Sequence, residues 1–251
     1  MAERNSKTLT IFVLIPTYNE AQNIELLANK LCTTLPAGNT LLVFVDDCSK
    51  DNTIDLIKKH FSLEYGIEII EKNQNKGPGD SFNIGFDWII KHSKNNHDII
   101  VTMEADNTSD IGILNNMITI SQLGYDLVLA SVYSQGGGFS KTSLFRKIVS
   151  FFANLMFRSI FNIKALTLSS FYRIYSISLL KSIQNEFSTI IFENGFICIL
   201  EILLKSIKLN ARIIEVPMIL NSDVRKGESK MKIIKTTISY TKFLIKNYKK
   251  Y

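Results

Sequence analysis

Two carboxylates separated by a single residue, Glu104 and Asp106, follow the apolar run Ile99–Met103. Carboxylates placed this closely can together bind a hard divalent cation such as Mg²⁺ or Mn²⁺. The cation would bridge to a diphosphate and neutralise the charge that builds on a leaving group. Because acidic strand ends are common, two solvated side chains are the alternative that this pair alone leaves open.

A second pair of carboxylates, Asp46 and Asp47, follows the apolar run Leu41–Val45. Adjacent carboxylates are costly to place together unless a cation or a hydrogen-bond donor meets them. A nucleobase N–H group or a ribose hydroxyl would meet that need, which makes the pair a candidate nucleoside site. The alternative is that Asp46 braces its own loop while Asp47 is solvated.

Two further loops place polar groups just before helical segments. Pro16 fixes a turn after the first apolar run, so the polar groups of 17–20 would lie at a helix start, and an ordinary capped helix is the alternative. In the segment 75–80, Gly77 lets the backbone approach a ligand and Lys76 can neutralise a phosphate. This segment has neither the Walker A nor the Rossmann glycine pattern. The four loops together therefore indicate a site for a phosphate-containing ligand.

The elements that must hold these loops follow from the hydrophobic pattern. Short runs rich in Ile, Val and Leu are typical of strands buried on both faces of a mostly parallel sheet. Segments with helical periodicity separate them, which predicts an open α/β sheet with right-handed crossovers. Ligands bind such sheets beyond the carboxyl ends of the strands, where the four loops lie. The expected strands are Thr10–Ile15, Leu41–Val45, Ile67–Ile70, Ile99–Met103 and Asp126–Ala130.

Two helix starts can also be predicted. Asn19 and Gln22 have the spacing of a capping box and would open the first helix. Asp51 would cap the second helix, which carries Ile54, Leu56 and Ile57 on its apolar positions.

Composition favours one domain followed by a basic tail. The chain has 251 residues, 46% of them hydrophobic, and no low-complexity stretch marks a linker. We expect one domain over 1–228 and a basic amphipathic helix over 229–251. Cys32, Cys48 and Cys198 lie far apart without CxxC spacing, which argues against a disulfide framework and a zinc site and favours a reducing compartment.

The positive charge gathers in two segments that could meet a membrane. The chain has a net charge of +6, and seven lysines but no acids lie between Lys230 and Lys250. That tail and the segment 144–164 both have the pattern of basic amphipathic helices that lie among lipid headgroups. A solvated helix and a core helix are the respective alternatives. No nucleic-acid-binding motif accompanies the charge, so a nucleic-acid partner is not expected.

Neither a signal peptide nor a transmembrane helix is expected. The apolar run 9–15 is short and ends at Pro16, which suits a buried strand better than a signal peptide. The longest apolar candidate, 148–166, is interrupted by polar and charged residues and falls short of the roughly 18 apolar residues that a span requires.

Taken in order along the chain, these motifs resemble the family-2 glycosyltransferases, above all the polyprenyl-phosphate (dolichyl-phosphate) mannosyltransferases. Pro16–Glu20 resembles the family's PTYNE opening and Val45–Ser49 its VDDxS segment, while Glu104–Asp106 stands where the family has Asp-Ala-Asp. Later segments also resemble the family, in the family's order. They are 136–138 with Arg146, Ser150 and Asn154, then 169–175, 194–217 and 225–231.

The resemblance implies a GT-A fold, a Rossmann-like, mostly parallel sheet flanked by helices, with a C-terminal amphipathic helix. It implies an inverting, Mg²⁺- or Mn²⁺-dependent glycosyltransferase that moves a sugar from GDP-mannose or a UDP-sugar to a polyprenyl phosphate. The enzyme would act at the cytoplasmic face of a membrane, with or without a membrane-anchoring partner. The implied donor-binding residues are Pro16, Tyr18, Glu20, Asp46, Asp47, Lys76, Gly77, Ala105 and Asp106. The implied metal ligands are Glu104 and Asp106, the catalytic residues are Asp106, Glu193 and Arg225, and the phosphate- or acceptor-binding residues are Arg146, Arg225, Ser229 and Lys230.

The chain departs from the family pattern at four positions that bear on donor and acceptor identity. Glu104 lengthens the reach of the first metal carboxylate, and Thr108 stands where a third ligand often lies. Val132 replaces an expected arginine, which removes a phosphate contact, and Phe171 replaces a glycine on the acceptor side.

Two other functions remain open at the level of sequence. Transfer to a hydroxyl of a glycan or protein would require a general base, for which Glu193 beside Asn194 is the candidate. A catalytically silent, membrane-associated scaffold would bind neither nucleotide sugar nor metal.

Overall fold

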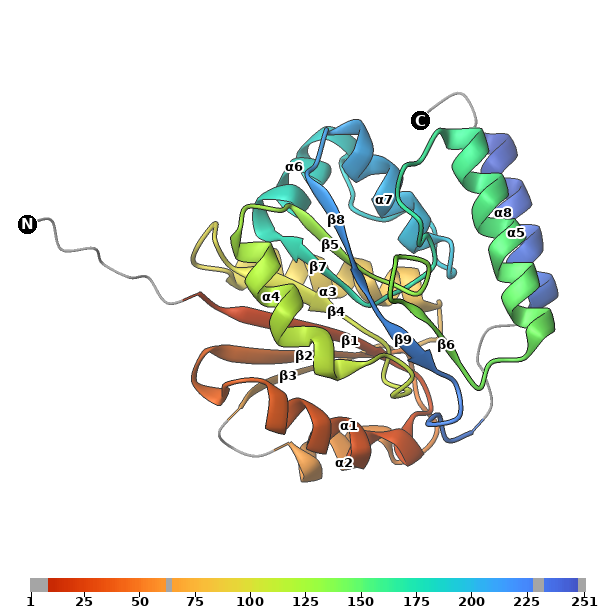
Figure 1. Cartoon of the computed structure of the whole chain (residues 1–251). Helices are drawn as coiled ribbons and strands as arrows, with labels where there is room; N and C mark the ends of the chain where they lie inside the picture. Colours follow the sequence, from red (N-terminus) through yellow and green to blue (C-terminus); the bar gives the residue numbers. More distant parts are fainter. Residues whose placement is uncertain (1–8, 62–64, 228–232, 248–251) are drawn as a thin grey trace, which may run out of the picture.

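The computed structural model describes residues 9–61, 65–227 and 233–247. Its centre is a seven-stranded sheet in the order β3-β2-β1-β4-β7-β5-β8 (Figure 1). All neighbouring strands run parallel except β7, which is antiparallel to both β4 and β5. The strands are β1 (Ile11–Thr17), β2 (Thr40–Asp46), β3 (Gly66–Glu71), β4 (Ile99–Thr102), β5 (Leu127–Ser131), β7 (Arg173–Ser176) and β8 (Ile213–Pro217).

The five strands expected from apolar runs are all present, and the mostly parallel sheet flanked by helices is confirmed. Burial on both faces explains their sequences. On β1, Phe12 and Leu14 enter one core cluster while Val13 and Ile15 enter the other. A strand with helices on both sides therefore needs apolar residues at every position, which produces a continuous run instead of an alternating pattern.

Helices cover the two faces of the sheet. The side of Val13 contacts α1 (Ala21–Thr34), α2 (Thr53–His60) and α4 (Leu114–Gln122). The side of Phe12 contacts α3 (Pro78–His92), α6 (Ile177–Phe187) and α7 (Cys198–Lys208). Short 3₁₀ turns lie at η1 (Ala37–Asn39) and η2 (Ile111–Ile113). A second, two-stranded parallel sheet pairs β6 (Gly138–Ser140) with β9 (Ile219–Asn221).

The two amphipathic helices predicted near the membrane lie side by side (Figure 1). These are α5 (Leu144–Phe161) and α8 (Ile233–Asn247). Their aromatic rings meet, with centroid distances of 5.2 Å for Phe157–Tyr240 and 6.4 Å for Phe161–Phe243. Phe157 and Phe243 are both buried in the core on the α3 side of the sheet. The C-terminal helix therefore packs against the body of the protein through α5.

One of the two predicted helix caps is wrong. Asn19 adopts a left-handed φ of 52°, and α1 begins after Glu20 without a side-chain cap. The Asn19 amide oxygen instead accepts a hydrogen bond from the Lys50 backbone N–H at 2.7 Å, which joins the first two loops. The Asp51 carboxylate accepts a hydrogen bond from the N–H of Thr53, the first residue of α2, but Asn52 and not Asp51 is the N-cap residue, so this cap is confirmed only in part.

Candidate active site

The order of the central strands gathers the predicted loops at one edge of the sheet. Because β2, β1 and β4 are parallel neighbours, the segments that follow them emerge side by side. These segments carry Asp46 and Asp47, Tyr18, and Glu104 with Asp106. The structure thus places the loops where a doubly wound sheet binds ligands.

Asp46 holds together its own turn. Its side chain is almost completely buried and accepts hydrogen bonds from the Thr17 hydroxyl at 3.1 Å and the Ser49 hydroxyl at 2.6 Å. Its second oxygen accepts the Ser49 backbone N–H at 2.8 Å. Three donors on one carboxylate offset its burial, so Asp46 braces the loop on which a nucleoside could rest.

Asp47 is buried as well, so the alternative that it is solvated is wrong. Its carboxylate forms an ion pair with Lys72 at 2.6 Å and accepts the backbone N–H groups of Lys76 and Gly77 at 2.9 and 2.8 Å. Lys72 also pairs with Asp80 at 2.7 Å. The network joins the second loop to the glycine-containing loop. Sequence reasoning missed Lys72, whose only signal is a basic residue two positions after the expected strand Ile67–Ile70.

The glycine-containing loop makes close backbone contact with a segment more than a hundred residues away. The Gly79 N–H donates to the Asn194 carbonyl at 2.8 Å, and a Cβ atom on Gly79 would lie 1.9 Å from the Glu193 carbonyl. Gly77, with a φ of 95°, leads into the helix. Only glycine fits such an approach. The contact brings Glu193, the candidate base, to the N-terminus of α3.

A buried ion pair holds that distant segment in place. Glu201 and Lys205 pair at 2.7 Å with side chains that are 2% and 0% exposed. The Glu201 carboxylate accepts the N–H groups of Phe192 and Glu193 at 3.0 Å, while Lys205 donates to the carbonyl of Ile190 at 2.9 Å. Nothing in the sequence singled out Lys205, because an (i, i+4) charge pair usually indicates an exposed helix face.

Asp106 meets Arg225, which lies 119 residues further along the chain, in an ion pair. The other Asp106 oxygen accepts the Thr108 backbone N–H at 3.0 Å and its hydroxyl at 2.7 Å. Glu104 accepts the Ser109 hydroxyl at 3.0 Å and the Phe171 N–H at 3.4 Å. Two of the three residues implied as catalytic, Asp106 and Arg225, are thus brought into contact.

Burial and the neighbouring Asp106 charge raise the pKa of Glu104 to about 7. The folded chain without a divalent cation then binds more protons than the unfolded chain between about pH 4.5 and 7. We therefore expect its free energy of unfolding to fall by on the order of 1–3 kcal/mol as the pH rises from about 4.5 to 7.

Glu104→Gln should remove that pH dependence, because the neutral amide keeps the shape without the titration. Urea unfolding of both proteins at about pH 5 and pH 8 without divalent cations measures it. The same loss of stability in both proteins would assign the effect to another group.

The donor set at this edge fits a divalent cation that is shared with a diphosphate. Within the described residues, no group of three or more His, Cys, Asp or Glu side chains could enclose a metal ion. Mg²⁺ commonly takes one or two carboxylates and completes its shell with water and phosphate oxygens. Glu104 and Asp106 would supply those carboxylates, and Thr108 orients Asp106 through a hydrogen bond.

The remaining predicted residues are distributed around this edge. Glu20 accepts the Asn23 amide at 2.7 Å, and Asn23 in turn bonds both backbone groups of Lys226, next to Arg225. Pro16 lies within β1, Ala105 is buried, Tyr18 is half-buried and Lys76 is exposed. The Arg146 side chain, Ser229 and Lys230 lie outside the described residues.

Phe171, where the family pattern has glycine, is buried against two other rings. Its centroid lies 5.1 Å from that of Phe82 and 5.6 Å from that of Phe196. Its N–H group is the donor to Glu104. The replacement therefore adds aromatic packing next to Glu104.

Known proteins share both the sequence and the fold. Residues 12–184 match the family described as Glycosyl transferase family 2. An undecaprenyl-phosphate mannosyltransferase of Micrococcus luteus is 26% identical over 223 residues, which cover 89% of this chain and 88% of the relative. A dolichol-phosphate mannosyltransferase of Pyrococcus furiosus is 29% identical over 57% of this chain, which spans only 38% of that relative.

Solved structures of glycosyltransferases share the arrangement of elements. The glucosyl-3-phosphoglycerate synthase of Mycobacterium tuberculosis, crystallised with Mn²⁺, uridine diphosphate and glucosyl-3-phosphoglycerate, superposes with a TM-score of 0.64 at 16% identity. The match covers 94% of this chain and 77% of that one, and at this identity it supports the fold alone. With the family match over most of the chain, this shows that the protein belongs to glycosyl transferase family 2 and is a glycosyltransferase with a GT-A fold.

Proposed function

We propose that this enzyme moves a sugar from a nucleotide-diphosphate donor, GDP-mannose or a UDP-sugar, to a polyprenyl phosphate at the cytoplasmic face of a membrane. The observation that carries the proposal is the meeting of Asp106, Glu104 and Arg225 at the carboxyl edge of the sheet. One arginine and two carboxylates there are the groups that a metal-bound diphosphate requires. The names of the relatives from Micrococcus luteus and Pyrococcus furiosus support the class of acceptor.

Each group has a role that follows from its contacts. A Mg²⁺ or Mn²⁺ ion, when bound, neutralises the diphosphate as it leaves. Glu104 and Asp106 would hold that ion, and Arg225, which now pairs with Asp106, could turn its guanidinium to a phosphate oxygen. The loop that carries Asp46 and Asp47 would form the surface against which the nucleoside packs. A polyprenyl phosphate is already ionised, so transfer to it needs no strong general base.

The direct test is a transfer assay with the full chain. GDP-mannose, UDP-glucose and UDP-N-acetylglucosamine are each supplied with Mg²⁺ or Mn²⁺ and polyprenyl phosphate in detergent. Metal-dependent labelling of the lipid is the expected result. The proposal is wrong if no donor labels the lipid.

Transfer to a hydroxyl is the second candidate, and one observation favours it. Glu193 is half-buried, its backbone carbonyl lies beside Gly79 at the N-terminus of α3, and its carboxylate makes no hydrogen bond with any described side chain or backbone group. An available carboxylate there could accept a proton from an acceptor hydroxyl. Release of nucleoside diphosphate only when glycans are added would select this candidate.

The membrane part of the proposal rests on the outer face of α5. Asn154 and Phe157 point inward and are buried, whereas the opposite side of the helix is apolar and exposed. The exposed residues are Leu144, Ile148, Val149, Phe151, Phe152, Leu155, Met156 and Ile160. None of the helices in the described part of the chain is long and apolar enough to cross a bilayer. We therefore propose that α5 lies along the surface of the bilayer.

Replacing Phe151 and Phe152, which are 51% and 62% exposed, with glutamate should prevent docking. Each buried phenylalanine contributes about 1.5–3 kcal/mol, so affinity for vesicles containing anionic lipid should fall at least ~100-fold. Nucleoside diphosphate binding should be unchanged. Co-sedimentation with vesicles measures the first quantity and calorimetry the second.

The matched control is Leu123→Glu, which adds a charge at another exposed apolar side chain, at the end of α4. It should leave vesicle binding intact. If the double variant binds vesicles as well as the unaltered chain does, the α5 face serves a different partner, such as an anchoring membrane protein.

A further inference from the structure

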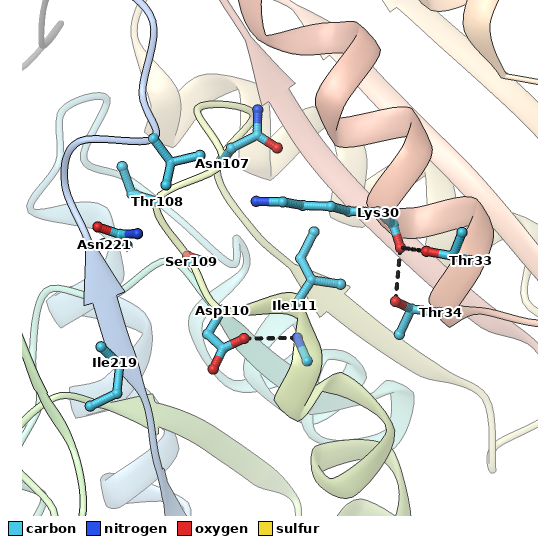
Figure 2. Close-up of a pocket in the computed structure, with 12 residues that line it drawn as sticks. Lys30, Thr33, Thr34, Asn107, Thr108, Ser109, Asp110, Ile111, Ile219 and Asn221 are labelled. Carbon is cyan, nitrogen blue, oxygen red and sulfur yellow. Dashed lines mark hydrogen bonds between the residues drawn. The ribbon is translucent and has the colours of Figure 1, made fainter. Parts of the chain in front are cut away.

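A pocket of about 370 Å³ lies between α1, the segment that follows Asp106, and β9. Its volume falls within the range of small-molecule sites, roughly 300–1,000 Å³. Figure 2 shows side chains from these three elements facing a common space. The lining residues are Lys30, Thr33, Thr34, Asn107, Thr108, Ser109, Asp110, Ile111, Gly112, Ile219, Asn221 and Val224.

Two amide oxygens of the lining are buried without a hydrogen-bond partner among the described residues. Asn107 is 2% exposed, and its nitrogen donates to the Asn23 carbonyl at 2.9 Å while its oxygen has no partner. The Asn221 residue is half-buried, and its side-chain oxygen is likewise buried without a partner among the described residues. An unsatisfied buried acceptor costs about 1–3 kcal/mol, so a ligand that donates hydrogen bonds here would relieve that cost.

One cation and one carboxylate complete the polar lining. Lys30 extends from α1 toward the segment 107–110 (Figure 2), and no described residue accepts a hydrogen bond from its ammonium group. Asp110 accepts the Gly112 N–H with one oxygen and keeps the other for further contacts. The Thr33 and Thr34 hydroxyls donate back into α1, so they can offer a ligand only acceptor capacity.

This combination selects the chemistry of the ligand. The formal charges of Lys30 and Asp110 cancel, so neither an anion nor a cation is favoured overall. The lining offers several hydrogen-bond acceptors and one strong donor, the Lys30 ammonium. Hydroxyl groups of a ligand can bond to both kinds, because a hydroxyl donates and accepts. Ile111, Ile219 and Val224 add apolar walls against which the C–H face of a sugar ring could pack. We propose that the pocket binds an uncharged, hydroxyl-rich molecule of about hexose size.

The wall of the pocket is also the segment that holds the metal carboxylates. Thr108 bonds Asp106, Ser109 bonds Glu104, and the Asn221 N–H donates to the Thr108 carbonyl at 3.0 Å. A ligand that orders this segment should therefore raise the affinity for the cation and the donor. By the same factor, the bound donor should raise the affinity of the pocket for its ligand. This coupling rests on the proposed function, whereas binding to the pocket does not.

Ligand-observed NMR and calorimetry test the binding step with free mannose, glucose, N-acetylglucosamine and inorganic phosphate as probes. The full chain is used, with saturating Mg²⁺ and nucleoside diphosphate so that the donor site is filled. We expect at least one hexose to bind with a Kd of about 1 mM or below, and phosphate not to bind. No turnover is needed, so an inactive protein would still report on the pocket.

Asn221→Leu and Lys30→Met should each weaken hexose binding at least tenfold. Lys59→Met removes the same charge from an exposed site on α2 and should change nothing. Lys30 is only half-buried, so Lys30→Met should fold and provides the test if Asn221→Leu is unstable. Absence of hexose binding, binding abolished by nucleoside diphosphate, preference for phosphate, or unchanged affinity in a folded variant would each overturn the proposal.

Discussion

Asp106→Asn should lower the rate of sugar transfer at least ~10³-fold while leaving the fold intact. The amide oxygen can still accept the N–H and hydroxyl of Thr108, so the local turn is preserved. What disappears is the negative charge that attracts a cation and that now attracts Arg225. The Arg225 side chain is 26% exposed, so water can solvate its charge once the partner is neutral.

The measurement is lipid-linked transfer at several Mg²⁺ and Mn²⁺ concentrations, with circular dichroism to check the fold. Asp223→Asn is the matched control, because it neutralises an aspartate whose partner, Lys141, is exposed. That control should retain activity. Full activity of Asp106→Asn at low metal concentration would remove Asp106 from the metal site.

The second large effect is expected for Glu201→Ala. The change leaves the fully buried Lys205 ammonium without its carboxylate, and breaking a buried pair in this way costs about 3–5 kcal/mol. It also removes the acceptor for the N–H groups of Phe192 and Glu193. Urea unfolding should show the loss of stability, and transfer activity should fall because the segment beside α3 is no longer held.

Replacing both partners, Glu201→Leu with Lys205→Met, separates these two effects. An apolar pair of similar volume avoids the uncompensated charge, so most of the stability should return. Activity should recover less, because the Phe192 and Glu193 N–H groups still lack an acceptor. If Glu201→Ala lowers the free energy of unfolding by less than about 1 kcal/mol, water reaches Lys205 and the pair is not a rigid support.

The pocket beside β9 changes how the region after Asp106 is understood. Thr108 bonds the Asp106 carboxylate, and its backbone is also part of the pocket wall. One short segment therefore holds Asp106, the proposed metal ligand, and also forms a wall of the pocket. If the pocket binds a hexose, enzyme activity could respond to the level of free sugar.

The sequence by itself predicted five strands of the central sheet, the edge at which the loops meet, and the family. Buried parallel strands require continuous apolar runs, and ligands bind beyond their carboxyl ends, so β1 to β5 and the loops of Asp46 and Asp106 followed from local pattern. Strand β7, which inserts antiparallel between β4 and β5, could not be predicted from local pattern, because strand order depends on contacts between distant segments.

The tertiary structure alone decided which distant side chains share a site. The Asp47–Lys72 pair, the Asp106–Arg225 pair and the approach of Asn194 to Gly79 all join residues whose local sequence carries no sign of the partner. Charge pairs and close backbone contacts depend on three-dimensional distance, whereas hydrophobic periodicity is a property of neighbours along the chain. For the same reason the chemistry of each loop could be predicted, but its solvent exposure could not.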